Sequence, residues 1–129
     1  MEEITKLKIL LAEDNWINQR IAILTFRQLG ISIDIASNGQ EALDMYRQNK
    51  YDLIMMDLQM PVMDGLETTR QIRTFEKETE SVHHVYIVAL TANAISELKE
   101  DCMLAGMDNF MEKPFHKSDL RNLLSKKIN

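Results

Sequence analysis

Short apolar segments alternate with longer amphipathic ones five times along the 129 residues of this chain. The apolar segments have the length of strands, and we expect strands at residues 8–12, 32–36, 52–57, 85–90 and 109–112. The first, third and fourth are almost wholly apolar, which is typical of central parallel strands covered on both faces. The second alternates isoleucine with polar residues, which favours a place at or near an edge of the sheet.

The segments between the strands carry apolar residues at helical spacing, such as Ile17, Ile21 and Leu24. We expect the last helix to begin at a cap on Ser118 or at the Pro114 turn. The stretch 76–81 is interpreted as a polar loop or a frayed helix end. The predicted helices cover residues 15–29, 38–49, a segment opening at Asp64 or Gly65, 94–105 and 117–128.

Repeated alternation of strand and helix means right-handed crossovers. The chain is therefore predicted to be a single doubly wound α/β domain, with a parallel sheet and helices on both faces. A net charge of −5 without a dense basic cluster argues against direct nucleic-acid binding. The one cysteine, Cys102, excludes an internal disulfide, and no stretch approaches the length of a membrane span or looks like a signal peptide. We expect a cytoplasmic domain with no membrane contact of its own, or a piece of a larger cytosolic chain.

An open parallel sheet binds its ligand at the carboxyl ends of its strands. Glu13 and Asp14 directly follow the first predicted strand, and Asp57 ends the third. Thr91 follows the fourth and Lys113 follows the fifth. We therefore expect three carboxylates, a hydroxyl and an ammonium group to converge on one crevice.

These groups suit phosphoryl transfer. Neighbouring carboxylates favour a bound cation, and an oxygen-only set with few protein ligands suits Mg²⁺. One carboxylate can then act as the nucleophile, while Lys113 and Thr91 contact phosphoryl oxygens. A simpler interpretation exists for each residue alone: Asp14 or Asn15 could cap the first helix, Thr91 could begin a loop, and Lys113 could be solvated.

Four segments carry a family resemblance: "ILLAEDNWINQ", "DLIMMDLQMPVMDG", "VALTANA" and "AGMDNFMEKPF". Over about residues 6 to 127 the chain resembles the CheY-like receiver domains of two-component response regulators. The sequences of these motifs are most similar to those of receivers in hybrid sensor histidine kinases. The resemblance implies a flavodoxin-like (βα)5 fold with strand order 2-1-3-4-5, spanning residues 1–129 as one receiver domain. It also implies a signalling switch rather than an enzyme, apart from catalysis of its own phosphorylation and dephosphorylation.

The resemblance also implies roles for matched residues. Asp57 would accept a phosphoryl group from a phosphohistidine, on a kinase dimerisation domain or a histidine phosphotransfer domain. Asp14 and Asp57 would bind Mg²⁺ directly, Glu13 through water and Gln59 through its backbone carbonyl, with Mn²⁺ as a substitute. Lys113 and Thr91 would contact the phosphoryl group.

Further positions concern switching and docking. Phe110 occupies the family's switch-aromatic position without the hydroxyl of a tyrosine, and Pro114 would follow a cis peptide bond. The switching and tuning positions also include Ala92, Asn93 and Gln59. Trp16 either covers the helix end or forms a docking surface for the phosphodonor with Ile17 and Ile21. His83 and His84 are interpreted as solvated loop residues, and Cys102 as a small buried hydrophobe.

Three other functions remain open. The chain could be a stand-alone response regulator rather than part of a hybrid kinase. It could be a Mg²⁺-dependent phosphohydrolase of small molecules, although Gln59 stands where such enzymes carry a second aspartate. It could also be a degenerate receiver that only binds partners, although its acidic set is complete.

Overall fold

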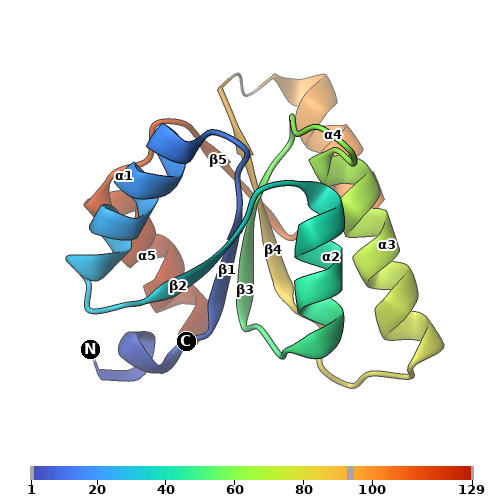
Figure 1. The fold of residues 1–129 in the computed structure, drawn as a ribbon, viewed down its shortest axis with the longest axis horizontal. Coiled ribbons are helices and arrows are strands. Elements are labelled where there is room, and N and C mark those ends of the chain that lie inside the picture. Colours follow the sequence, from blue (N-terminus) through green and yellow to red (C-terminus); the bar gives the residue numbers. More distant parts are fainter. Residues whose placement is uncertain (1, 93–94, 129) are drawn as a thin grey trace.

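The computed structural model describes residues 2–92 and 95–128, which form one five-stranded sheet flanked by five α-helices (Figure 1). A short 3-10 helix, Glu2–Lys6, precedes the first strand. The strands are β1 (Ile9–Ala12), β2 (Ile33–Ala36), β3 (Leu53–Asp57), β4 (Tyr86–Thr91) and β5 (Asn109–Glu112). The helices are α1 (Trp16–Arg27), α2 (Gly39–Gln48), α3 (Gly65–Glu78), α4 (Ser96–Ala105) and α5 (Lys117–Ile128).

All neighbouring strands are parallel, in the order β2-β1-β3-β4-β5. Helices α1 and α5 cover one face of the sheet, and α2, α3 and α4 cover the other (Figure 1). The doubly wound fold and its strand order are thus confirmed. The alternating segment forms the edge strand β2, and the three apolar segments form the central strands, as predicted.

Successive residues of a strand point to opposite faces of a sheet, so each central strand supplies two cores. On β1, Leu10 packs into the core beneath α2 and α3, while Leu11 packs into the core beneath α1 and α5. The first core includes Leu43 and Ile72, and the second includes Phe26. This burial on both faces accounts for the nearly continuous apolar composition of the central strands.

The structure decides between the alternatives that were predicted for two helix starts. Asn15 caps α1, because its side chain accepts a 3.0 Å hydrogen bond from the Asn18 N–H. Asp14 is therefore not the cap, and its carboxylate is left for the rim of the sheet. The predicted cap at Ser118 is wrong: α5 begins at Lys117, and the Asp119 carboxylate accepts from the His116 N–H at 2.8 Å.

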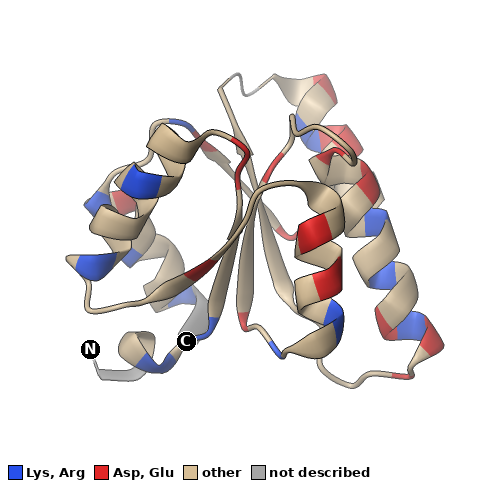
Figure 2. Ribbon diagram, in the orientation of Figure 1, with Lys and Arg blue, Asp and Glu red and all other residues tan. Residues whose placement is uncertain are grey.

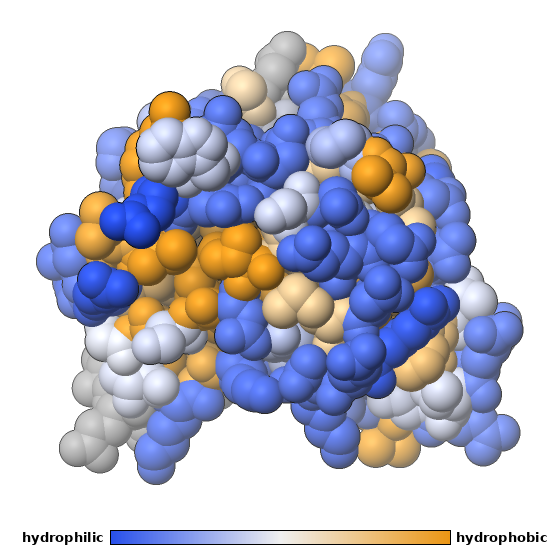
Figure 3. Space-filling view, viewed as in Figure 1, coloured by the Kyte–Doolittle hydropathy of each residue, from blue (hydrophilic) through white to orange (hydrophobic). Residues whose placement is uncertain are grey.

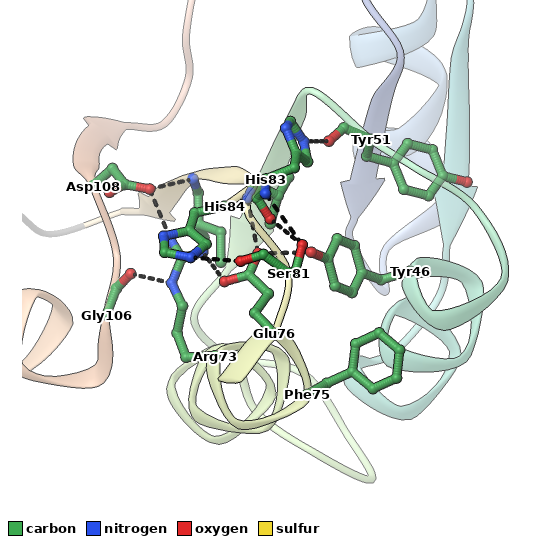
Figure 4. A network of polar contacts seen from close by, with 12 residues as sticks. Tyr46, Tyr51, Arg73, Phe75, Glu76, Ser81, His83, His84, Gly106 and Asp108 are labelled. Atoms are coloured by element: carbon green, nitrogen blue, oxygen red, sulfur yellow. Dashed lines mark hydrogen bonds and ion pairs between the residues drawn. The ribbon is translucent and has the colours of Figure 1, made fainter. Parts of the chain in front are cut away.

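The interpretation of 76–81 as a polar loop or frayed end is also wrong at its first residues. Helix α3 continues to Glu78, and Glu76 is 3% exposed. The Glu76 carboxylate accepts hydrogen bonds from the Tyr46 hydroxyl at 2.6 Å, from the Val85 N–H at 2.8 Å and from Arg73 at 2.8 Å (Figure 4). A buried carboxylate is tolerated here because donors from α2, from α3 and from the segment before β4 satisfy it.

Arg73 extends this network to the segment between α4 and β5. Its guanidinium donates to the Gly106 carbonyl at 2.9 Å and to Asp108 at 2.8 Å (Figure 4). The rings of His83 and His84 lie in the same region and contact the carbonyls of Tyr51 and Ser81. Both histidines are exposed, as predicted, but each is tied to the backbone. The network lies at the amino ends of β3 and β4, where it joins α2, α3 and the sheet.

The predicted small buried hydrophobe Cys102 is confirmed as a buried free thiol on α4. Among the described residues, no helix combines the length and the apolar composition needed to cross a bilayer. Lysine and arginine are scattered over the helices in Figure 2 rather than gathered in one stripe.

Candidate functional site

The carboxyl ends of four strands bring the predicted polar residues to one rim of the sheet. Glu13 follows β1, Asp57 is the last residue of β3 and Thr91 is the last residue of β4. Lys113 follows β5 directly. All four line a pocket of about 440 Å³, together with Asp14 and Gln59. The convergence predicted from the strand ends is therefore present, and acidic residues mark this rim in Figure 2.

Lys113 lies between two of the carboxylates. Its Nζ donates to Glu13 Oε1 and to Asp57 Oδ2, both at 3.1 Å. Glu13 is 3% and Asp57 5% exposed, so both acids are nearly removed from water. Burial alone lowers the pKa of Lys113, but the hydrogen bonds and charges of Glu13 and Asp57 outweigh it and raise that pKa above its usual value. Lys113 is therefore held in its charged form between the two acids.

The acid cluster has the chemistry of a site for a hard cation. Glu13, Asp14 and Asp57 each offer a carboxylate oxygen, and these oxygens lie within 4.8 Å of one another. One ammonium group against three carboxylates leaves a local excess of negative charge. Asp14 is exposed, and within the described part of the chain its carboxylate makes no hydrogen bond or ion pair. The residues present thus fit Mg²⁺, which takes few protein oxygens and keeps several waters.

The loop after β3 is packed tightly against Asp57. The Gln59 N–H donates to Asp57 Oδ1 at 3.3 Å, which places Gln59 at the rim of the pocket. Gly65 opens α3 and donates from its N–H to the Leu58 carbonyl at 3.1 Å. A Cβ on Gly65 would collide with the main-chain oxygen of Asp57, so only glycine fits this close approach.

Among the described switching positions, Ala92 lines the acidic pocket, Pro114 follows Lys113, and Phe110 lies on β5. Phe110 on β5 is half-buried, and the Lys99 ammonium group of α4 lies 5.5 Å from its ring centroid. The Lys113–Pro114 peptide bond is cis, as predicted. Ala92 is exposed at the edge of the pocket. Asn93 lies outside the described residues.

The predicted docking residues are exposed on α1. Trp16 is 69%, Ile17 53% and Ile21 55% exposed, so Trp16 does not bury itself against the helix end. Leu24 continues the same stripe, and the buried residues of α1 are Ala22 and Phe26 instead. We call Trp16, Ile17, Ile21 and Leu24 the α1 apolar stripe. Figure 3 shows apolar surface gathered over the α1 side of the molecule, while the α2 and α3 side is mostly hydrophilic.

A second pocket, of about 390 Å³, lies between α1 and the segment after β5. Ile21 of the α1 apolar stripe lines it, as do Pro114 and Phe115. Glu13 and Lys113 line both this pocket and the acidic one, so the apolar surface continues into the polar site.

Two contacts, one at the rim and one between α4 and β5, involve residues that the sequence analysis did not single out. The Gln19 side chain donates to the Glu13 carbonyl at 2.6 Å, and Lys99 lies over Phe110. No sequence motif predicts either contact, because each depends on how two elements pack against each other.

These features define an α/β domain with an acidic rim that suits a hard cation, and comparisons with known proteins identify its family. The family model "Response regulator receiver domain" matches residues 9–125. The chain belongs to this family, whose members are receiver domains of two-component systems and signalling domains rather than classical enzymes.

Curated relatives are receiver-bearing histidine kinases. Hybrid signal transduction histidine kinase K of Dictyostelium discoideum is 42% identical over 124 residues, covering 94% of this chain. Histidine kinase 5 of Arabidopsis thaliana is 40% identical over 146 residues, covering 96% of this chain. The chain spans only 10% and 16% of the lengths of these two relatives.

Solved structures agree with the fold. The receiver domain of sensor histidine kinase PA1611 from Pseudomonas aeruginosa, with magnesium in its active site cleft, is 38% identical with a TM-score of 0.83, covering 95% of this chain and 97% of that one. The receiver domain of Ssk1 from Saccharomyces cerevisiae, crystallised with the histidine phosphotransfer protein Ypd1, is 38% identical with a TM-score of 0.86, covering 95% and 88% of the two chains.

Proposed function

We propose that this receiver domain takes a phosphoryl group from a phosphorylated histidine onto Asp57. The observation that carries the proposal is the position of Lys113, whose ammonium group contacts both Asp57 and Glu13 beside an acid cluster. A carboxylate held beside a fixed cation is ready to receive an anionic group. Asp57 also ends a central strand, so packing on both faces of the sheet fixes its backbone.

The phosphoryl transfer exchanges a phosphorus–nitrogen bond for a phosphorus–oxygen bond. An Asp57 carboxylate oxygen forms a bond to phosphorus while the bond from phosphorus to the donor's imidazole nitrogen breaks. The electron pair of the broken bond stays on the imidazole, which takes up a proton from solvent. Lys113 offsets negative charge on the phosphoryl group during transfer. The Thr91 hydroxyl donates a hydrogen bond to a phosphoryl oxygen. The domain thereby promotes its own phosphorylation. Attack of water on the same phosphorus breaks the bond to Asp57, releases inorganic phosphate and restores the carboxylate.

Mg²⁺ is the cofactor that this chemistry needs. Asp14 and Asp57 would hold it directly, Glu13 through water and Gln59 through its carbonyl oxygen. When bound, it supplies positive charge next to the phosphoryl oxygens. The receiver with magnesium in its active site cleft supports this assignment. Mn²⁺ also prefers oxygen ligands in octahedral geometry, so we expect it to substitute.

The phosphorylated state acts as a switch or as a relay intermediate. In a switch, the doubly charged product draws Thr91 inward and shifts the population of the α4–β5 face, where Phe110 lies beneath Lys99. Pro114, Ala92, Asn93 and Gln59 would tune that shift and the lifetime of the phosphorylated state. In a relay, the phosphoryl group passes from Asp57 to another histidine.

The partner is a histidine phosphotransfer domain or a kinase dimerisation domain that carries the phosphohistidine. The Ssk1 receiver crystallised with Ypd1 supports a partner of this kind. The α1 apolar stripe, led by Trp16, Ile17 and Ile21, would receive it beside the acidic pocket. A buried free cysteine fits the reducing cytoplasm, where we place the domain.

We also propose that residues 1–129 act as one receiver domain. Similarity to hybrid kinases favours a place in such a kinase over a stand-alone regulator, and the chain spans only a tenth of the first of these relatives.

The proposal is tested by intact mass after incubation with acetyl phosphate and Mg²⁺. We expect one added phosphoryl group that requires both the metal and Asp57, so that Asp57→Asn and a chelator each abolish it. Turnover of a generic phosphate ester would instead favour a small-molecule phosphohydrolase. A protein that takes up no phosphoryl group and does not respond to Mg²⁺ would be a degenerate receiver that only binds partners.

A further inference from the structure

We infer that Gln19 is a positioning residue for the acid pair: its side-chain amide fixes the peptide between Glu13 and Asp14 and so aims the Asp14 carboxylate at the metal. This inference rests on the proposed metal site. The observation behind it is the hydrogen bond from Gln19 Nε2 to the Glu13 carbonyl oxygen, at 2.6 Å. Gln19 itself lies outside the pocket lining, so it is not a ligand.

The hydrogen bond from Gln19 to the Glu13 carbonyl replaces one that pairing of β1 with β2 would provide if the two strands continued. The Glu13 N–H still donates to the Ala36 carbonyl of β2 at 3.0 Å, which is the last step of the ladder between the two strands. In a continued parallel ladder, the next donor to the Glu13 carbonyl would be the N–H of residue 38. Asn38 instead caps α2, with its side chain accepting from the Glu41 N–H. The Gln19 amide supplies the missing donor.

The hydrogen bond from Gln19 matters more for the orientation of the Asp14 side chain than for that of Glu13. The Glu13 side chain is fixed independently, by Lys113 and by the Asn15 N–H at 3.1 Å. The Asp14 carboxylate is exposed and has no side-chain partner among the described residues, so only its backbone orients it. A planar peptide joins the Glu13 carbonyl to the Asp14 N–H, so holding the carbonyl holds the backbone of Asp14 as well.

Gln19 also ties this peptide to a rigid support. Its backbone N–H donates to the Asn15 carbonyl at 2.9 Å within the first turn of α1, and its side-chain amide lies 3.4 Å from Ser37 Oγ. The side chain thus joins α1 to the two segments that leave β1 and β2. The loop that carries the acid pair is held from both sides.

The test is the Mg²⁺ affinity of Gln19→Met, which keeps side-chain length and removes the donor. Titration of backbone amide shifts by NMR gives the dissociation constant without requiring phosphorylation. We expect it to rise about tenfold, the low end of the effect of losing a group that orients a metal ligand. Gln28→Met, at the exposed far end of the same helix, is the matched control and should match wild type.

Gln19→Glu is the second variant, since it keeps the shape but faces the carbonyl with a carboxylate. Either variant binding Mg²⁺ as tightly as wild type, while unfolding more easily in chelator, would overturn the inference and leave Gln19 a purely structural role. Asp14→Asn separates this outcome from failure of the site itself. If wild type and Asp14→Asn respond to Mg²⁺ alike, the metal site is wrong, and the role of Gln19 falls with it.

Discussion

Lys113 Nζ lies 3.1 Å from Asp57 Oδ2, a contact between residues 56 positions apart, of which Asp57 ends β3 and Lys113 follows β5. The same ammonium group contacts Glu13 at the same distance. Because both acids are nearly buried, this one cation offsets part of the repulsion between them. The stability of the fold and the chemistry of the site therefore depend on the same side chain.

Removal of the Lys113 ammonium group should lower the stability of the fold. Lys113→Met leaves two adjacent buried carboxylates without their partner, and we expect a loss of about 3 kcal/mol in the free energy of unfolding in chelator. Urea unfolding measures it, with Lys77→Met on the exposed surface of α3 as the matched control. Added Mg²⁺ should restore part of the loss by binding only the native state. Equal stability of Lys113→Met and wild type in chelator would contradict this account.

Removal of one acid should have the opposite effect. Asp57→Asn lowers the negative excess of the cluster while Lys113 keeps Glu13 as its partner. We expect the variant to melt about 3–5 °C above wild type in chelator, which corresponds to roughly 1 kcal/mol. The gap should narrow as Mg²⁺ is added, since the metal stabilises wild type more. Asp44→Asn on the surface of α2 controls for loss of a charge. A melting temperature of Asp57→Asn below that of wild type in chelator would contradict the prediction.

The fold and the members of the site were predictable for physical reasons. Parallel strands buried on both faces need nearly unbroken apolar runs, and their carboxyl ends share one rim. Asp57, Thr91 and Lys113 could therefore be placed together from their positions after such runs. Their separate contacts could not, because the pairing of Lys113 with Glu13 spans 100 residues and depends on loop geometry.

The error at residues 76–81 and the exposure of the α1 apolar stripe have a common cause. The segment beginning at Glu76 has the composition of a solvated loop, yet the Tyr46 hydroxyl of α2 and the Val85 N–H before β4 donate to Glu76 and allow its burial. Ile17 and Ile21 follow the spacing of a buried helix face, yet Phe26 marks the face that packs on the sheet. Local composition records which side chains can be buried, and the neighbouring elements decide which are.

The Tyr46–Glu76 hydrogen bond predicts a dependence of stability on alkaline pH. Burial, followed by the hydrogen bond and charge of Glu76, raises the pKa of Tyr46 well above its usual value of 10.0. The unfolded chain loses this proton first, so the contribution of Tyr46 is complete below about pH 10 and is lost as pH rises towards the folded pKa.

Tyr46→Phe should therefore cost about 1–2 kcal/mol at pH 7 and show a shallower fall of stability above pH 10. Urea unfolding at steps from pH 7 to 11 measures both effects. Tyr86→Phe, whose hydroxyl accepts from the Asn109 amide at 3.2 Å, controls for loss of a hydroxyl. Parallel pH profiles for wild type and Tyr46→Phe would contradict the proposed linkage.

The α1 apolar stripe predicts a separation between chemistry and docking. Ile21 is 55% exposed and lines the apolar pocket, but it does not line the neighbouring acidic pocket. Ile21→Asp should leave the melting temperature and the labelling by acetyl phosphate close to wild type. It should slow transfer from a phosphorylated histidine phosphotransfer domain at least tenfold, because the substitution puts a charge into the proposed apolar docking surface. Ile95→Asp, an equally exposed residue beside α4, is the matched control, and equal transfer rates for the two variants would place docking elsewhere.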